Sequence, residues 1–154
     1  MNNNINIIEF EKDIMVNIDQ ILQYENIKKY FHDENKVIEI QKREYASDII
    51  DKLIVGKNIC IYGILIKNKE IGSKWELKYI GVRKSREIKQ RLKQHFVNKS
   101  DQTNSQLARI SKLDGKAILG LKLANIADIK LRNYYEEKLI EDFKPGWNSH
   151  GNKK

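Results

Sequence analysis

The sequence is poor in cysteine, in proline and in long apolar runs, and each shortage excludes a class of protein. The single cysteine, Cys60, rules out an intramolecular disulfide, and one cysteine with three scattered histidines cannot form a Cys/His zinc site. No apolar run reaches the roughly 18 residues of a membrane-spanning helix, and the first residues lack the basic flank and apolar stretch of a secretory signal. One proline and eight glycines form no linker. We therefore expect a cytoplasmic protein that has no membrane partner.

Positive charge is concentrated in one part of the chain. Residues 1–54 carry 7 Lys and Arg against 11 Asp and Glu, whereas residues 55–154 carry 22 against 10. The densest stretch is 83–99, where seven basic residues accompany one acidic residue, Glu87. Such a run is often only a solvated helix face, and a membrane surface would require a strongly hydrophobic opposite face. Nucleic acid is the partner that the charge favours.

The apolar pattern changes at Gly56, so we divide the chain into an N-terminal helical extension (1–55) and a second unit (56–154). The extension has helical periodicity over residues 5–30 and 47–55, and a short strand over 37–40 is weakly indicated. In the second unit we expect strands at 59–66, 75–80 and 116–123, and helices at 86–97, 106–113 and from 128 to the stop at Pro145. The predicted fold is α+β, a three-stranded antiparallel sheet flanked by helices.

The helix at 86–97 carries two faces of interest. Ser85 is its expected N-cap, and Ile88, Leu92 and Phe96 recur every four residues as a buried stripe. Arg91 and His95 are also four residues apart, so they lie side by side next to that stripe.

Four segments, in order, resemble the signature of the GIY-YIG nucleases. They are Ile61-Tyr62 in the first strand, Tyr79-Ile80-Gly81 at the end of the second, Arg91 and His95 in the next helix, and the stretch from Glu136 through Pro145 to Asn148. Each segment alone is common, and their order on the expected elements carries the resemblance. It covers about residues 56–149. It departs from the family at Cys60, where the first glycine would stand, in the 16 residues between Tyr62 and Tyr79, and in a slightly long step from Gly81 to Arg91.

The resemblance implies a metal-dependent DNA endonuclease with six catalytic residues. They are Tyr62, Tyr79, Arg91, His95, Glu136 and Asn148. Glu136 is the only carboxylate that the match supplies, which implies one Mg²⁺ ion, with Mn²⁺ as a substitute, rather than a two-metal clamp. Arg91 would bind the non-bridging phosphate oxygens.

The remaining roles follow from the same resemblance. Tyr62 would help to take the proton from the attacking water, which requires a pKa lowered by the basic residues around it. His95 would assist proton transfer or orient the water or Tyr62, Tyr79 would orient the phosphate or the nucleophile, and Asn148 would support the site near Glu136. Five further cations are expected to hold the DNA backbone, namely Arg83, Lys84, Arg86, Lys89 and Lys93.

The expected protein is a type II restriction endonuclease that acts on double-stranded DNA as a homodimer. Only six residues follow Asn148, so target selection is expected to come from the extension, the long hairpin, the loop at 98–105 or a second subunit. The alternatives are a mobile-element or repair-type nuclease of the same family, a catalytically silent nucleic-acid-binding module and a toxin-like RNase. The recognition sequence cannot be read from the chain.

Overall fold

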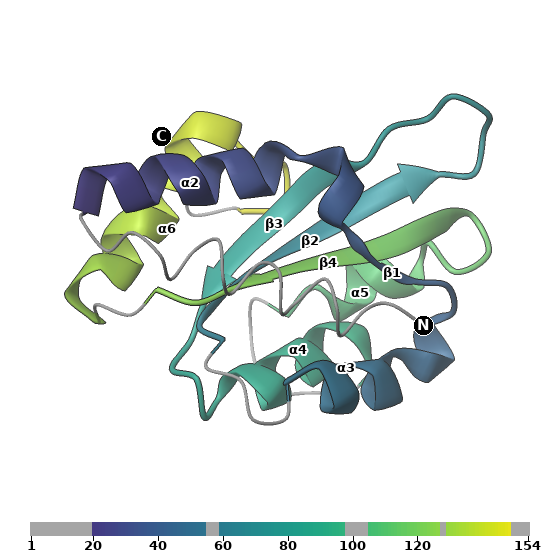
Figure 1. Ribbon diagram of the computed structural model, residues 1–154. Helices are drawn as coiled ribbons and strands as arrows, with labels where there is room; N and C mark the ends of the chain where they lie inside the picture. Colours follow the sequence, from purple (N-terminus) through teal and green to yellow (C-terminus); the bar gives the residue numbers. More distant parts are fainter. Residues whose placement is uncertain (1–19, 55–58, 98–104, 127–128, 149–154) are drawn as a thin grey trace.

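The computed structural model describes residues 20–54, 59–97, 105–126 and 129–148, which form an α+β fold (Figure 1). The helices are α2 (Gln20–His32), α3 (Ala46–Ile54), α4 (Ile88–Phe96), α5 (Leu107–Ser111) and α6 (Ile129–Phe143), with 3-10 turns η1 (Glu34–Lys36) and η2 (Arg43–Tyr45). The strands are β1 (Ile38–Ile40), β2 (Ile61–Asn68), β3 (Glu76–Val82) and β4 (Ala117–Ala124). None of the helices in these ranges combines the length and the apolar character needed to cross a membrane.

The sheet has four antiparallel strands in the order β1-β4-β2-β3. The expectation of three strands is therefore wrong, because β1 from the extension pairs with β4. Ile38 and Ile40 of β1 are buried against Leu121 and Leu119, while Glu39 between them is exposed. A strand of only three residues shows too little alternation of apolar and polar side chains to be identified with certainty from sequence.

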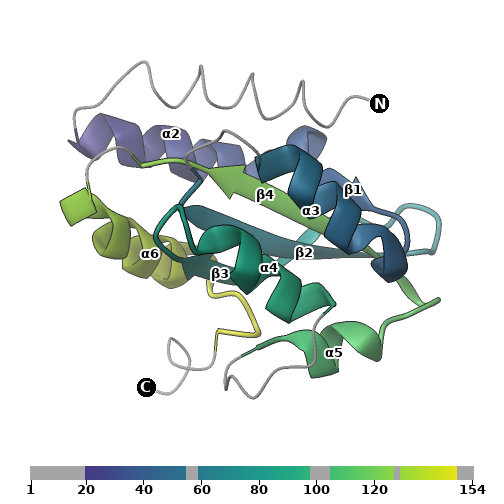
Figure 2. The same ribbon diagram turned by 90° about the horizontal axis from the view of Figure 1, so that it is seen from below.

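Helices cover both faces of the sheet, α2 and α6 on one side and α3, α4 and α5 on the other (Figures 1 and 2). Residues 61–66 of β2 are all buried, as the continuous apolar run predicted. The stripe of Ile88, Leu92 and Phe96 on α4 is fully buried, again as predicted. The N-cap prediction is wrong, because α4 begins after Glu87, whose side chain makes no capping hydrogen bond. Tyr62 points to the α4 side of the sheet.

The part of the extension that the structure describes packs directly on the sheet. Ile27 and Phe31 of α2 belong to the core that covers β2, β3 and α6. Lys122 of β4, fully buried, donates hydrogen bonds from Nζ to the backbone carbonyls of Tyr30 and Asp33 at the end of α2. Burial lowers the pKa of the Lys122 ammonium to about 8. The division at residues 55 and 56 stays a prediction, and the predicted helical residues 5–19 lie outside the described ranges.

The free edge of β3 is occupied by the segment after α6. The register between β2 and β3 skips Lys78, a β-bulge between the pairs Ile64–Tyr79 and Leu65–Leu77. The backbone N–H of Trp147 donates to the Lys78 carbonyl over 2.8 Å. The Asn148 amide both accepts from Ile80 N–H and donates to Ile80 O, each over 2.9 Å. Residues 147 and 148 thus continue the hydrogen bonding of the sheet at the strand that carries Tyr79.

Candidate active site

Tyr62 and Gly81 face each other across β2 and β3, and the glycine makes room for the tyrosine. A Cβ atom on Gly81 would lie 2.5 Å from Tyr62 Cζ and closer still to the hydroxyl oxygen. Any other residue at position 81 would therefore push the phenol out of its place. A steric requirement therefore explains the glycine of the predicted Tyr79-Ile80-Gly81 segment, because the Tyr62 ring passes over position 81 and leaves no room for a side chain.

Tyr62, Tyr79 and His95 form a cluster of three rings. Ring centroids lie 6.1 Å apart for the two tyrosines, 5.6 Å for Tyr62 and His95, and 5.1 Å for Tyr79 and His95. The Tyr62 hydroxyl is 2.8 Å from His95 Nε2. Tyr62 and His95 are fully buried and Tyr79 is 9% exposed. The structure therefore brings together three residues that are spread over the 33 positions from Tyr62 to His95.

The direction of the Tyr62–His95 hydrogen bond is set from behind the histidine. The backbone N–H of Gln106 donates to His95 Nδ1 over 3.0 Å, so Nδ1 carries no proton. Burial, with Arg91 and Arg83 nearby, lowers the pKa of His95 to about 3, so the ring is neutral and its one proton is on Nε2. His95 consequently donates to Tyr62, and the hydroxyl oxygen of Tyr62 is the acceptor.

The environment of Tyr62 differs from the sequence expectation in one respect. Its pKa is raised above the ordinary value for tyrosine because burial disfavours the phenolate, and the neighbouring Tyr79 adds to the effect. Arg91 and Arg83 act in the expected direction, but burial outweighs them. The expectation of a lowered pKa is wrong for the protein without metal or DNA.

Arg91 lies beside this cluster at the edge of a small cavity. Its side chain is 4% exposed, and one terminal nitrogen donates to Gln94 Oε1 over 2.9 Å. It also interacts with the Tyr62 hydroxyl, an interaction that lowers the tyrosine pKa. The cavity measures about 210 Å³ and is lined by Arg83, Glu87, Gln90, Arg91 and Gln94. Two guanidinium groups against the one carboxylate of Glu87 leave this space positive, and with the two amides they suit a phosphate group.

Glu136 belongs to α6, which covers the face of the sheet opposite to α4 (Figures 1 and 2). Burial raises the pKa of its carboxyl to about 7, Arg83 lowers it, and Glu137 raises it further. The charge of Arg83 also acts on Tyr62 and His95. The charge of Arg83 thus acts on both Glu136 and the ring cluster. The sequence had predicted only that this arginine binds the DNA backbone.

Asn148 holds the backbone of β3 through its side-chain amide. Its amide is fully buried, and both its oxygen and its nitrogen are bonded to Ile80. Ile80 stands between Tyr79 and Gly81, so Asn148 fixes the strand that presents these two residues. It is a positioning residue for β3, and the expected supporting role near Glu136 stays a prediction.

The described residues contain no group of three or more His, Cys, Asp or Glu side chains that could hold a metal ion. A metal at this site would depend on one protein carboxylate. Glu136 suits this, because a partly buried carboxyl with a pKa near 7 gains from a neighbouring cation. Mg²⁺ is commonly held by one or two carboxylates together with waters and substrate phosphates.

The five cations expected to bind DNA are not equivalent. Lys93 and Lys89 of α4 form ion pairs with Asp51 of α3, at 2.8 and 3.7 Å. These two lysines join α4 to the extension, a use that the sequence pattern does not reveal. Lys84 and Arg86 are exposed in the turn before α4, where they can reach a polyanion.

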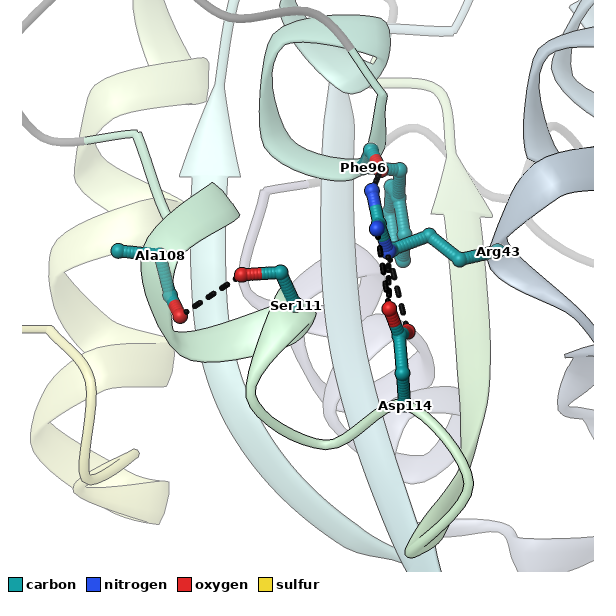
Figure 3. A network of polar contacts seen from close by, with 5 residues as sticks. All are labelled: Arg43, Phe96, Ala108, Ser111 and Asp114. Atoms are coloured by element: carbon teal, nitrogen blue, oxygen red, sulfur yellow. Dashed lines mark hydrogen bonds and ion pairs between the residues drawn. The ribbon is translucent and has the colours of Figure 1, made fainter.

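A second network fixes the end of α4 (Figure 3). Arg43 of η2 donates from Nε and one terminal nitrogen to the Asp114 carboxylate, over 2.9 to 3.2 Å. Its other terminal nitrogen donates to the carbonyl of Phe96 over 3.0 Å. Phe96 follows His95 directly, so Arg43 holds the helix turn that carries the histidine. Ser111 nearby donates to the Ala108 carbonyl within α5.

Sequence reasoning missed Gln106, Arg43 and Asp114. Gln106 acts through its backbone, which no side-chain pattern can show. Arg43 and Asp114 are separated by 71 positions and carry no motif. Arg83 was recognisable only in part, since its place two residues after Gly81 puts it at the end of the strand that bears Tyr79.

Cys60 stands where the resembled family has glycine, and its side chain has a place here. The thiol is buried and lies 3.2 Å from the backbone N–H of Ile126, from which it accepts a hydrogen bond. A small apolar side chain is therefore accommodated at this position. Comparisons with protein-family models, curated proteins and solved structures found no match.

His95 should stay neutral over the whole physiological range of pH. An unfolded histidine titrates near 6.5, so between about 6.5 and 3 the unfolded chain binds a proton that the folded chain does not. Because of His95, the free energy of unfolding therefore decreases as the pH falls below about 6.5. Nitrogen-15 NMR of the imidazole should show protonated Nε2 and unprotonated Nδ1 from pH 8 to 5. A midpoint near 6.5 would contradict the assigned hydrogen bonds.

Glu136→Gln should stabilise the metal-free protein at pH 8. The wild-type carboxyl has a raised pKa, so its contribution to stability is complete below about pH 4.5 and is lost as the pH rises through about 7. We expect a gain on the order of 1–2 kcal/mol in unfolding free energy at pH 8 in EDTA, and little gain at pH 4.5.

Glu141→Gln on the exposed part of the same helix provides the control for this measurement. Thermal unfolding of the control should match the wild type at both pH values. An equal effect of the two substitutions, or a loss of stability in Glu136→Gln at pH 8, would show that Glu136 is an ordinary solvated carboxylate.

Proposed function

We propose that this protein is a divalent-metal-dependent DNA endonuclease of the GIY-YIG kind. The observation that carries the proposal is the buried Tyr62–His95 hydrogen bond, with its direction fixed by Gln106 and with Arg91 beside it. A polar pair of this kind is costly to bury and is unnecessary for a packed core. The basic part of the chain, residues 55–154 with 22 Lys and Arg against 10 Asp and Glu, supports a polyanionic substrate.

The proposed reaction is hydrolysis of a phosphodiester bond whose phosphate lies in the cavity at Arg91. The guanidinium groups of Arg91 and Arg83 neutralise charge that develops on the non-bridging oxygens. The Tyr62 hydroxyl first releases its proton to solvent, and the hydrogen bond from His95 Nε2–H and the charge of Arg91 stabilise the phenolate. The phenolate takes a proton from the attacking water as the water oxygen bonds to phosphorus, which restores the phenol. The bond between phosphorus and the leaving sugar oxygen breaks, and that oxygen takes a proton from solvent. Because burial raises the pKa of Tyr62, its phenolate is a strong base that is present only briefly.

Glu136 is proposed as the ligand of one Mg²⁺ ion, with Mn²⁺ as a substitute. Such an ion supplies positive charge to the phosphoryl oxygens and to the attacking water. Glu136 must lose its proton to act as a ligand, so at limiting Mg²⁺ cleavage should increase as the pH rises toward about 7, and saturating Mg²⁺ should move this increase to lower pH. The Tyr79 ring packs against the rings of Tyr62 and His95 and keeps both in position.

For the biological role we propose a type II restriction endonuclease that cuts double-stranded DNA as a homodimer in the cytoplasm. Two copies of one site related by a twofold axis cut both strands symmetrically. A mobile-element or repair-type nuclease would share the chemistry, and the distribution of cut ends separates the roles. Discrete sites in digested phage DNA support restriction, and scattered ends support another role.

Purified protein should convert supercoiled plasmid to nicked or linear DNA with Mg²⁺ or Mn²⁺ and should lose this activity in EDTA. Glu136→Gln should reduce the rate by about 10³-fold or more and leave DNA binding within about twofold, because the carboxylate holds the metal and the basic residues remain. Tyr62→Phe should lose chiefly the maximal rate, whereas Arg91→Ala should lose both rate and affinity.

Glu141→Gln again serves as the control and should cut like the wild type. Wild-type protein that binds DNA without cutting it would identify a silent binding module, and EDTA-resistant cleavage of RNA would identify a metal-independent RNase. Either result contradicts the proposal, as does full activity of Glu136→Gln.

A further inference from the structure

A groove runs along the β2–β3 hairpin on the same face of the sheet as Tyr62 and Tyr79. It measures about 330 Å³, and its floor is made by Ile66, Leu113 and Trp147. The inner end lies at Lys78, the residue before Tyr79, where the Trp147 backbone N–H bonds the Lys78 carbonyl. From there it extends to Asn68 and Lys74 near the turn of the hairpin. The turn projects beyond the rest of the sheet (Figure 1).

The lining of the groove combines cations with an aromatic floor. Lys74 and Lys78 stand on its β3 side. Outside the lining, the guanidinium of Arg109 lies 5.8 Å from the centre of the Trp147 ring. The groove also contains Glu76, which pairs with Lys78 over 3.0 Å. Two lysines and an arginine against one carboxylate leave the region positive. Lysine ammonium groups suit the phosphates of a duplex backbone, and the apolar floor can contact its sugars.

The position of the groove relates it to the proposed reaction. Lys74 and Lys78 are four residues apart on and before an extended strand, a distance of about 13 Å at about 3.3 Å per residue. That length matches about four nucleotides at 3.4 Å per step. The inner end of the groove is at Lys78, next to Tyr79 of the ring cluster, so a strand whose scissile phosphate lies at Arg91 can continue into the groove. Lys89 and Lys93 on α4 are already paired with Asp51, so they offer less to the substrate.

We propose that this groove binds the DNA backbone on one side of the scissile phosphate, over about four nucleotides, through Lys74 and Lys78. The proposal rests on the proposed nuclease function, since it extends the path of that substrate. It also assigns a function to the long hairpin: the hairpin lengthens the binding surface in one direction from the site.

The test compares Lys74→Ala/Lys78→Ala with Lys28→Ala/Lys29→Ala. The two pairs are matched, because each removes one exposed lysine and one ion-paired lysine, Lys28 being paired with Asp142 of α6. Lys28 and Lys29 lie on α2, across the sheet from the groove (Figure 1). Binding to a fluorescent 30-base-pair duplex is measured by anisotropy in EDTA over a range of NaCl concentrations.

The groove variant should bind the duplex about tenfold more weakly at moderate salt. The slope of log Kd plotted against log salt concentration should fall by about 1.8, because each of the two lost phosphate contacts removes about 0.9. On saturating plasmid with Mg²⁺ it should keep the wild-type maximal rate while its KM rises. The matched control should keep the wild-type affinity and slope. Lys74→Ala alone, which changes only an exposed side chain, should show about half of the change in slope.

Unchanged affinity and slope in the groove variant, with wild-type protein that binds and cuts DNA, would overturn the groove and leave the nuclease function intact. Wild-type protein that neither binds nor cuts any DNA would overturn the nuclease function itself. Polyglutamate is tested as a competitor of the duplex at equal charge concentration. If it competes with the wild-type protein and no longer binds the groove variant, the groove binds acidic protein segments, and DNA is overturned as its occupant.

Discussion

The candidate site depends on the place that Gly81 leaves for Tyr62. Because position 81 has no side chain, the phenol of Tyr62 can cross β3 and reach His95 on α4. The contact joins two adjacent strands and a helix, and it sets the positions of Tyr79 and Arg91 around the same ring. Asn148 protects this arrangement from the other side by holding Ile80, the neighbour of Gly81. A site built on strands and supported in this way has little freedom to move.

The described part of the extension belongs to the same packed unit as the site. β1 completes the sheet, and Lys122 bonds the backbone at the end of α2. Asp51 forms an ion pair with Lys93 of α4, and Arg43 bonds the last carbonyl of that helix. Arg43 bonds the carbonyl of Phe96 next to His95, and Asp51 binds Lys93 one turn earlier on the exposed face. The extension therefore helps to set the position of the helix that carries Arg91 and His95. This is a direct structural role for acidic residues in a protein whose other part is strongly basic.

Much of the fold could be predicted from sequence because its signals are local. The apolar run of β2, the stripe on α4 and the stop at Pro145 depend on neighbouring residues, and the structure agrees with them. β1 was not assigned with certainty, since three residues depend on a distant partner strand for their stability. The resemblance names Tyr62, Tyr79 and His95 as parts of one site, and the structure places their rings together, whereas their catalytic role stays a prediction. The raised pKa of Tyr62, the direction of its hydrogen bond and the contribution of Arg83 depend on burial and on a backbone group 44 positions away, so they required the structure.

The proposed function requires Arg91 of α4 and Glu136 of α6 to act on the same phosphate. A crystal structure of the Tyr62→Phe variant with duplex DNA and Ca²⁺ is the decisive measurement. We expect a phosphate in contact with the Arg91 guanidinium and one Ca²⁺ ion held between that phosphate and Glu136. A Ca²⁺ ion held by Glu87, which lines the same cavity as Arg91, or DNA bound away from both helices would contradict it.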